Sequence, residues 1–262
     1  MNAVLVGQPF APYGASHWLI LALLTVGAVW LVSWGRRHRE TPAAVRFRRR
    51  FALLILALQV PMQVMSMVPP YWNLAQSLPL QLCDLAWMVT AYALWSGRPW
   101  AFALTYYWGL TLTIQALITP GLQFDFPHVS FFMFWGGHGL AVLAAIFLTW
   151  GLGWRPGWIS YRFAYAVTLM WIFVTLLFNY AAGTNYGFLN AKPAGISILD
   201  LLGPWPWYLA AEIALVAVLW ALITWPWVRR RASTDCGSRT GRAGERCHAP
   251  GGAVRSPNSV LR

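Results

Sequence analysis

The stretch SHWLILALLTVGAVWLVSWG occupies residues 16–35 and ends directly before Arg36 and Arg37. An α-helix of about 20 apolar residues crosses the ~30 Å hydrocarbon core of a bilayer, and this stretch has that length. No basic segment precedes it and arginines follow it, which is the reverse of a secretory signal peptide. The stretch therefore predicts a retained membrane-spanning helix.

Comparable apolar runs recur along the whole chain. Hydrophobic residues make up 58% of the 262 residues and charged residues 10%, whereas soluble domains carry roughly 25% charged residues. So little charge cannot cover a water-facing surface, which excludes soluble enzymes, nucleic-acid-binding modules and disulfide-stapled secreted domains. The predicted fold class is an all-α polytopic membrane protein, a bundle of about seven transmembrane helices. The predicted spans are residues 16–35, 51–68, 80–96, 100–118, 129–152, 159–182 and 205–227.

Basic residues are concentrated in two parts of the chain. Of the 19 lysines and arginines behind the net charge of +12, seven are arginines between Arg36 and Arg50 and eight follow Val228. Cytoplasmic loops carry the excess of basic residues, so we expect these arginines to hold loops at the cytoplasmic side, with the N-terminus outside and the C-terminus in the cytoplasm. We expect residues 1–227 to form the seven-helix transmembrane domain and residues 228–262 a disordered, arginine-rich cytoplasmic tail. We expect no nucleic-acid partner.

Ionisable residues inside the predicted spans lie towards one membrane face. Such residues are costly in hydrocarbon, so they indicate a functional site by default. Spans 80–96, 129–152 and 205–227 begin at the predicted outer face, and at 1.5 Å per residue their polar side chains lie within roughly 5–15 Å of it. The segment 185–208 mixes polar and aromatic residues, and we expect it to cover this pocket. The candidate site residues are Gln81, Cys83, Asp84, His138, Glu212, His17, His128, Asn185, Lys192 and Asp200.

Cys83 and His138 suggest the chemistry of this pocket. Cys83 lies near the start of a predicted helix, where the helix dipole and unpaired N–H groups favour a thiolate nucleophile. A histidine can take the proton from such a thiol, and a carboxylate can orient the histidine. Glycines at positions 136, 137 and 139 would let another helix approach the imidazole closely. The orienting carboxylate stays open among Asp84, Asp125 and Glu212.

Structural interpretations of the same residues also stay open. A buried cysteine in a membrane helix can be a packing residue, and a membrane histidine can simply bond a neighbouring helix. His17 and His128 lie near the interface and can be solvated. Lys192 can meet a lipid phosphate or pair with Asp200 or Asp84. No pair of candidate ligands has the spacing of a metal site, so we expect neither a metal nor another cofactor.

Several short motifs extend this pattern. They are Leu78-Pro-Leu-Gln-Leu-Cys83-Asp84, Leu117-Ile-Thr-Pro120, Phe126-Pro-His128, His138-Gly139, Asn185-Tyr-Gly-Phe-Leu189, Lys192-Pro193 and Leu199-Asp-Leu-Leu-Gly-Pro-Trp-Pro-Trp-Tyr208. Together they resemble the bacterial YwaF-like integral membrane proteins, a family that also includes the vertebrate transmembrane protein 164. The resemblance covers about residues 10–227 and is most specific in residues 185–208.

The resemblance implies a cysteine-dependent acyltransferase that moves fatty acyl chains between phospholipids, including ether phospholipids. In that interpretation Cys83 accepts the acyl group, His138 is its partner, and membrane phospholipids are the molecules bound. The bacterial pattern has a histidine two residues before the cysteine, whereas this chain has Gln81, which donates hydrogen bonds but does not titrate. The resemblance also implies a multi-pass protein of the cell membrane, the inner membrane in bacteria. No protein partner is predictable from the sequence.

Two functions from different classes follow. The first is a phospholipid acyltransferase or acyl hydrolase at the outer leaflet, in which Cys83 attacks an acyl ester and His138 takes its proton. Gln81, Asn185 or backbone N–H groups would stabilise the oxyanion. The alternative is a small-molecule transporter or receptor with an outward-facing polar cavity. A transporter would need polar groups that continue towards the cytoplasm, and the predicted spans contain few.

Overall fold

The computed structural model describes residues 7–193 and 198–240 of the 262-residue chain. These residues are helical almost throughout, and a single bridge between Pro9 and Phe124 is their only strand-like pairing. α4, η1 and α5 form one continuous segment, as do α6 and η2, so the described part has seven long helical segments. In chain order the elements are α1 (Ala15–His38), α2 (Pro42–Ser66), α3 (Leu82–Ser96), α4 (Pro99–Tyr107), the π-helix η1 (Trp108–Leu112), α5 (Thr113–Ile118), α6 (Val129–Ile146), the π-helix η2 (Phe147–Gly151), α7 (Trp158–Ala182), the 3₁₀ turns η3 (Tyr186–Phe188) and η4 (Ile198–Leu202), and α8 (Trp207–Thr240).

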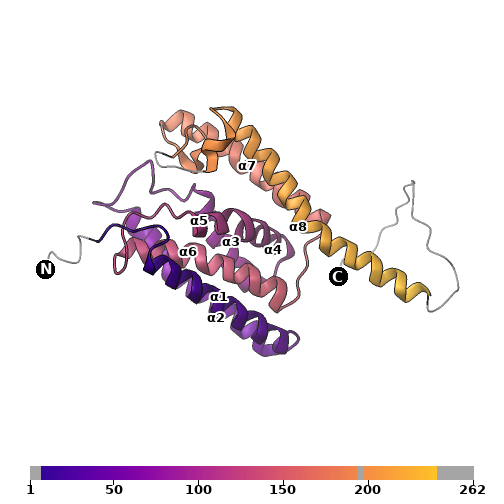
Figure 1. Cartoon of the computed structure of the whole chain (residues 1–262). Helices are drawn as coiled ribbons and strands as arrows, with labels where there is room; N and C mark the ends of the chain where they lie inside the picture. Colours follow the sequence, from indigo (N-terminus) through magenta and orange to yellow (C-terminus); the bar gives the residue numbers. More distant parts are fainter. Residues whose placement is uncertain (1–6, 194–197, 241–262) are drawn as a thin grey trace.

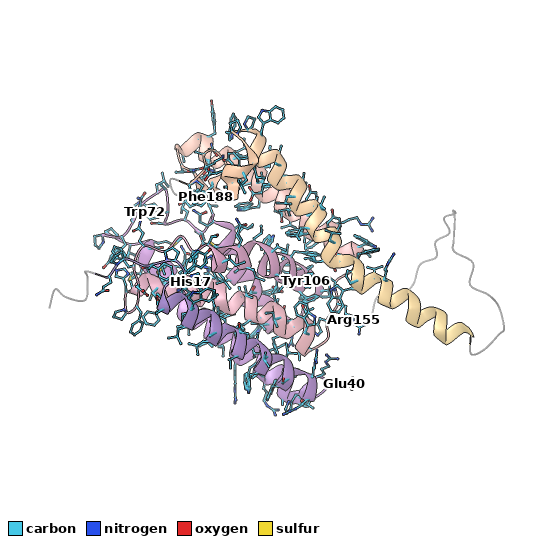
Figure 2. The ribbon with its side chains drawn as sticks, viewed as in Figure 1. His17, Glu40, Trp72, Tyr106, Arg155 and Phe188 are labelled. Atoms are coloured by element: carbon cyan, nitrogen blue, oxygen red, sulfur yellow. The ribbon has the colours of Figure 1, made fainter. Side chains whose placement is uncertain are left out.

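Consecutive long helices run in opposite directions between two ends of the bundle. At one end, called the arginine end, α1, α3 and η2 finish and α2, α4 and α7 begin. The opposite end, called the loop end, is formed by the segments before α3, before α6 and between α7 and α8. Figure 2 shows His17 near the loop end and Glu40 and Arg155 near the arginine end. Figure 1 shows α7 and α8 together on one side of the other helices, with α8 extending beyond them.

Among the described residues, five helical segments are long and apolar enough to cross a membrane. This finding confirms the predicted all-helical, polytopic membrane architecture. The two other predicted spans, 51–68 and 80–96, correspond to α2 and α3, and both helices differ from the expectation. The five segments are Ala15–His38, Pro99–Ile118, Val129–Gly151, Trp158–Ala182 and Trp207–Arg229.

α2 begins before its predicted span and contains much of the arginine run. Pro42 occupies its first turn, where the proline ring suits the helix and no N–H is needed. Arginine is a good helix former, so residues 46–50 belong to the helix and the expectation of a basic loop there is wrong. The connection between α1 and α2 is limited to residues 39–41.

α3 is shorter than a membrane crossing. Its 15 residues span about 22 Å, against ~30 Å for the hydrocarbon core. It finishes at the arginine end with Gly97, whose φ of 70° is the left-handed C-cap conformation that favours glycine. Its parallel neighbour, Val129–Gly151, has 23 residues. The N-terminus of α3 at Leu82 therefore lies inside the bundle, farther from the loop end than the start of α6.

The last helix is longer than its predicted span. α8 runs from Trp207 to Thr240, past residue 227, after which we expected the tail to begin. The rest of the predicted tail, residues 241–262, lies outside the described residues.

Small residues let the helices approach each other closely. A Cβ atom added to Gly35 of α1 would lie 2.8 Å from the Cα of Gly151 in η2. A Cβ added to Gly109 of η1 would lie 3.0 Å from the Cβ of Ala145 in α6. Lipid tails are as apolar as the helices, so close van der Waals packing of this kind holds membrane helices together.

Buried polar side chains bond between the helices of the core. The hydroxyl groups of Tyr107 and Thr224 lie 2.6 Å apart and join α4 to α8. The indole N–H of Trp108 donates to the hydroxyl of Thr168 at 2.9 Å and joins η1 to α7. With no water in the hydrocarbon core, such groups need partners within the protein, so these bonds attach α7 and α8 to the central helices.

The contact between Gly35 and Gly151 predicts a large effect of one added methyl group. We expect Gly35→Ala to lower the free energy of unfolding by about 1–3 kcal/mol, because the methyl group meets backbone that cannot move aside. The matched control is Gly27→Ala on the same helix, where the new Cβ would lie 3.7 Å from a methyl group of Leu143, an ordinary contact. Thermal unfolding in detergent measures both variants, and equal melting temperatures would contradict the packing argument.

Candidate functional site

α3 and α6 run in the same direction, and their ends are aligned at the arginine end. The guanidinium of Arg48 packs against Gly97, the residue that caps α3. The same guanidinium lies over the ring of Trp154, 5.2 Å from its centroid, shortly after η2 ends. One arginine side chain thus contacts the C-terminal ends of both helical segments.

This alignment brings Cys83 and His138 to a similar level of the bundle. Each lies thirteen residues before the last residue of its helical segment, Ser96 for α3 and Gly151 for α6–η2. Thirteen residues correspond to about 20 Å along a helix. α3 and α6 are in contact, but no hydrogen bond joins the thiol to the imidazole in the described part of the chain.

The first turn of α3 presents backbone N–H groups beside the Cys83 thiol. The amide of Asp84 donates to the carbonyl oxygen of Gln81 at 3.0 Å, and the amides of Cys83 and Asp84 also interact with the sulfur of the Cys83 side chain. Gln81 does not cap the helix with its side chain, because its Oε1 accepts the amide hydrogen of Gly187 at 2.9 Å. The thiol therefore shares the positive end of the helix with the carboxylate of Asp84, which accepts the amide hydrogen of Gln81.

The imidazole of His138 is oriented by backbone. Its Nδ1 lies 2.9 Å from the carbonyl oxygen of Phe134. A carbonyl oxygen only accepts, so Nδ1 carries the hydrogen and the lone pair of the neutral ring is on Nε2. The expectation of an orienting carboxylate is thus wrong for this structure. Asp125 accepts hydrogen bonds from the Ser16 hydroxyl and from the Phe126 amide, both at 2.7 Å.

The glycines around His138 admit neighbouring helices, as the sequence suggested. The side-chain amide of Gln59 in α2 packs against Gly136 and Gly137 and donates to the carbonyl oxygen of Met133 at 3.2 Å. On another face, Gly139 receives the side chain of Leu24 from α1. The close approach to α6 therefore comes from α1 and α2.

The other two predicted site histidines bond to elements at the loop end. His17 is fully buried; its Nδ1 accepts the amide hydrogen of Tyr13 and its Nε2 donates to the carbonyl oxygen of Leu117, both at 2.9 Å. His128 is the N-cap of α6, since its Nδ1 accepts the amide hydrogen of Ser130. His17 thus joins the start of α1 to the end of α5, whereas His128 caps α6 locally, and neither ring forms a hydrogen bond with Cys83.

A buried amide organises the loop end. Asn179 in the last turn of α7 is 1% exposed. Its Oδ1 accepts from the amide of Tyr186 and the hydroxyl of Thr184, both at 2.8 Å. Its Nδ2 donates to the carbonyl oxygen of Tyr186 at 2.9 Å and to Oδ1 of Asn190 at 3.0 Å. The side chain therefore fixes the segment that follows α7.

Tyr186 in turn holds the segment that precedes α3. Its hydroxyl donates to the carbonyl oxygen of Leu74 at 2.6 Å and accepts the amide hydrogen of Leu78 at 3.0 Å. The indole N–H of Trp171 donates to the carbonyl oxygen of Leu80 at 3.0 Å. The sequence placed Asn179 and Tyr186 among the polar residues of this face but did not select them as site residues, and it did not single out Trp171. The available signal was an asparagine inside a predicted span, because an amide there needs bonding partners.

The remaining loop residues bond within their own segment. Oδ1 of Asn185 accepts the amide hydrogens of Asn190 and Ala191, both at 3.1 Å. Lys192 pairs with Asp200 at 3.5 Å, one of the two partners that we expected, and its Nζ lies 5.7 Å from the centroid of the Tyr208 ring. These contacts close the connection between α7 and α8 over the loop end.

Glu212 lies nearer the arginine end than the start of α3 does. The hydroxyl of Tyr165 is 3.5 Å from the carbonyl oxygen of Ile213, the next residue after Glu212. Trp171, which bonds the segment before α3, lies six residues later on α7, or about 9 Å along the helix. Of the predicted carboxylates, Asp84 is therefore closest in level to Cys83, its neighbour in the chain.

A family model described as the TMEM164 family matches residues 12–224. This chain belongs to the TMEM164 family. The match confirms the resemblance to transmembrane protein 164 and supports a multi-pass membrane protein, while the narrower YwaF-like assignment stays a prediction. The matched residues run from before α1 into α8, so they include the TMEM164-family counterparts of α3, α6 and the loop end. A search of curated proteins and a search of solved structures return no match.

The role of Asn179 predicts that Asn179→Ala loosens the loop end. We expect the free energy of unfolding to fall by about 1–3 kcal/mol, because the buried backbone of Tyr186 loses its partners. Thermal unfolding measures this change, and chymotrypsin cleavage at Tyr186 or Phe188 should become faster. The control is Tyr180→Ala at the adjacent position, whose side chain is 87% exposed. Equal melting temperatures and cleavage rates for Asn179→Ala and Tyr180→Ala would contradict the role of Asn179 in fixing the loop end.

Proposed function

We propose that this member of the TMEM164 family is a cysteine-dependent acyltransferase or acyl hydrolase that acts on membrane phospholipids. The observation that carries the proposal is the position of Cys83. Its thiol lies in the first turn of a helix that begins inside the bundle, level with an imidazole whose Nε2 carries the lone pair. This is the activity that the resemblance to transmembrane protein 164 implies.

The first half of the reaction would transfer an acyl group to the protein. Sγ of Cys83 attacks the acyl carbonyl carbon of a phospholipid ester, and Nε2 of His138 takes the thiol proton. The carbon–oxygen bond of the ester then breaks, and His138 returns the proton to the departing lysophospholipid oxygen. Cys83 is left as an acyl thioester.

The second half would release the acyl group by the same chemistry in reverse. A hydroxyl group of another lysophospholipid attacks the thioester carbonyl in a transferase, and water does so in a hydrolase. His138 takes the proton of the attacking group and returns it to Cys83 as the carbon–sulfur bond breaks. The same dyad serves both outcomes, so the choice depends on which acceptor reaches the thioester.

The start of α3 offers groups for the oxyanion. The N–H groups of Cys83 and Asp84 interact with the sulfur of the Cys83 side chain and sit at the positive end of a helix. Gln81 uses its Oε1 for Gly187, which leaves its Nε2 as a further donor. Preorganised donors of this kind stabilise the charge that develops on a carbonyl oxygen.

A base is needed at this position. The thiolate is the nucleophilic form of cysteine, so attack by the partly buried Cys83 requires a group that takes the thiol proton. The thiol and imidazole are not hydrogen-bonded without substrate. Catalytic hydrogen bonds are commonly long in the free enzyme and tighten in the complex, so the proposal requires closure of this gap around the bound ester.

The orientation of the protein belongs to the same proposal. Arginines collect at one end of seven alternating helices, and the excess of basic residues marks the cytoplasmic side. The chain would then cross the cell membrane seven times. Its N-terminus would lie outside and α8 would end in the cytoplasm. The segment before α3 is enclosed by protein, and it would form the third crossing together with α3. Cys83, about 20 Å from the arginine end, would lie in the outer half of a ~30 Å core.

The catalytic prediction concerns Cys83 and His138. In proteoliposomes, with labelled acyl transfer from phosphatidylcholine to a lysophospholipid or to water as the readout, Cys83→Ala should abolish turnover. His138→Gln should reduce it by about 10²–10⁴-fold, the range for loss of a general base. The wild type should also accumulate a hydroxylamine-sensitive acyl adduct that Cys83→Ala lacks.

Matched controls separate chemistry from folding. Cys236→Ala and His38→Gln remove the same residue types far from the start of α3 and should retain full turnover. All variants should unfold at temperatures close to that of the wild type. Turnover by Cys83→Ala at the wild-type rate would eliminate the mechanism.

The topology prediction uses single cysteines. The starting variant has serine in place of its three cysteines. A new cysteine introduced by Ala11→Cys should react with a membrane-impermeant maleimide in intact cells. A new cysteine introduced by Arg37→Cys should react only after the membrane is permeabilised, because residue 37 lies at the arginine end. The opposite labelling pattern would reverse the proposed orientation.

A further inference from the structure

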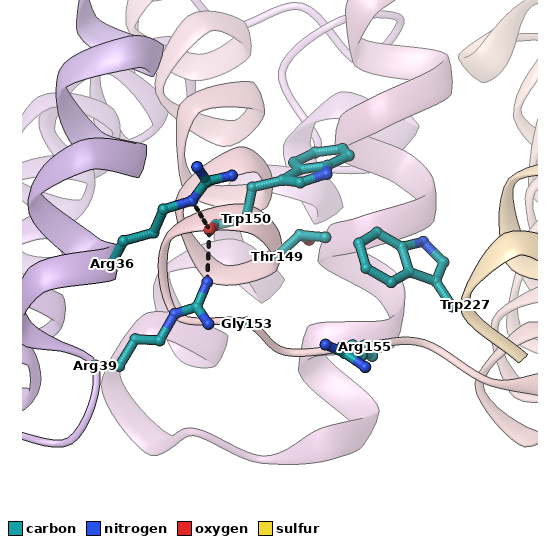
Figure 3. Close-up of a pocket in the computed structure, with 7 residues that line it drawn as sticks. All are labelled: Arg36, Arg39, Thr149, Trp150, Gly153, Arg155 and Trp227. Atoms are coloured by element: carbon teal, nitrogen blue, oxygen red, sulfur yellow. Dashed lines mark hydrogen bonds between the residues drawn. The ribbon is translucent and has the colours of Figure 1, made fainter. Parts of the chain in front are cut away.

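A basic cavity lies at the arginine end. It has a volume of about 390 Å³, within the size range of small-ligand sites. None of its lining residues is acidic. Figure 3 shows three arginines and two tryptophans around it. It is lined by Arg36, Arg39, Thr149, Trp150, Gly153, Arg155 and Trp227.

Arg36 in the last turn of α1 and Arg39 in the connection that follows converge on one acceptor in this cavity. Nε of Arg36 donates to the carbonyl oxygen of Trp150 at 3.3 Å, and Nη2 of Arg39 donates to the same oxygen at 3.1 Å (Figure 3). Arg39 also donates to the carbonyl oxygen of Gly151 at 2.7 Å. The end of a helix attracts cations, but a carbonyl oxygen carries only partial charge. Two guanidinium groups held this close repel each other, and an anion beside them would relieve that repulsion.

Thr149 provides an independent indication of a ligand. Its side chain is 1% exposed, and its Oγ1 has no hydrogen-bond partner among the described residues. Buried hydroxyl groups are normally bonded, and this one lies in the wall of the basic cavity. An acceptor oxygen bound in the cavity would supply the missing partner.

An apolar cavity adjoins the basic one. Its volume is about 430 Å³, and it shares Trp150 and Trp227 with the basic cavity. It extends between the central helices and α8 towards the middle of the bundle. Its other lining residues are Tyr106, Leu110, Ile114, Ile223 and Pro226.

We propose that the two cavities together bind one phospholipid with a net negative headgroup. Its phosphate would bind Arg36 and Arg39 and accept from Thr149, and one acyl chain would occupy the apolar cavity. Guanidinium groups recognise phosphate through paired hydrogen bonds, and basic pockets between membrane helices bind anionic headgroups. The arginines disfavour a choline or other cationic headgroup, and the apolar cavity favours a lipid over free phosphate.

This lipid would differ from the substrate of the proposed acyl transfer. Cys83 lies about 20 Å from the arginine end, whereas the esters of a phospholipid lie only a few bonds from its phosphate. A lipid with its phosphate in the basic cavity therefore keeps its esters away from the thiol. The inference stands on the two cavities and does not depend on the activity of Cys83.

The test is binding of defined probes to the full chain in detergent, measured by native mass spectrometry. Dihexanoyl phosphatidylglycerol should bind at least 10-fold more tightly than dihexanoyl phosphatidylcholine, glycerophosphoglycerol or inorganic phosphate. Arg36→Gln should weaken it about 10-fold and Thr149→Val several-fold. Arg37→Gln is the matched control, because it removes the same charge from the next residue of α1, which does not line the cavity. It should change binding less than 2-fold.

Each other outcome overturns the proposal in a defined way. Equal binding of glycerophosphoglycerol or phosphate would mean a site for small anions, and equal binding of phosphatidylcholine would mean apolar partitioning. Equal effects of Arg36→Gln and Arg37→Gln would mean non-specific attraction to the basic end. Thr149→Val keeps the shape of the side chain. If this folded variant binds the lipid as tightly as the wild type, the Thr149 hydroxyl does not contact the lipid.

Discussion

Backbone groups inside a bilayer find no water to bond, and this constraint explains how the loop end is built. α3 is too short to reach that end, so its first turn and the segment before it must bond within the protein. Tyr186 and Trp171 bond the backbone of the segment before α3. The side chain of Gln81 in turn accepts the amide hydrogen of Gly187, and Asn179 holds the segment that carries Tyr186. The connection after α7 is therefore part of the wall around Cys83.

The same constraint acts on the other end of α6. The carbonyl oxygens of Trp150 and Gly151 in the π-helix η2 accept hydrogen bonds from Arg36 of α1 and from Arg39, which follows α1. Close packing of Gly35 against Gly151 brings α1 near enough for this contact. The arginines that mark one membrane side in the sequence thus also serve as partners for backbone, and two of them line a cavity suited to an anion.

The two ends offer different chemistry to a lipid. At the level of Cys83, a thiol at the positive end of a helix and an imidazole with its lone pair on Nε2 suit attack on an uncharged ester. At the arginine end, guanidinium groups and an unpartnered hydroxyl suit a phosphate. If both proposals hold, the lipid bound at the arginine end and the ester that reacts at Cys83 belong to different molecules.

The sequence by itself determined the membrane class, the apolar helices and the end at which arginines collect, because these depend on local length and composition. It also selected Cys83 and His138 and predicted that glycines would admit close neighbours to α6. Only the tertiary structure decided that α3 begins inside the bundle, that Phe134 orients His138, and that His17 bonds backbone through both ring nitrogens. It alone revealed Asn179 as a hub and joined Arg36 to Trp150. The partner of a buried polar group usually lies far away in the chain, so it follows from packing and not from local pattern.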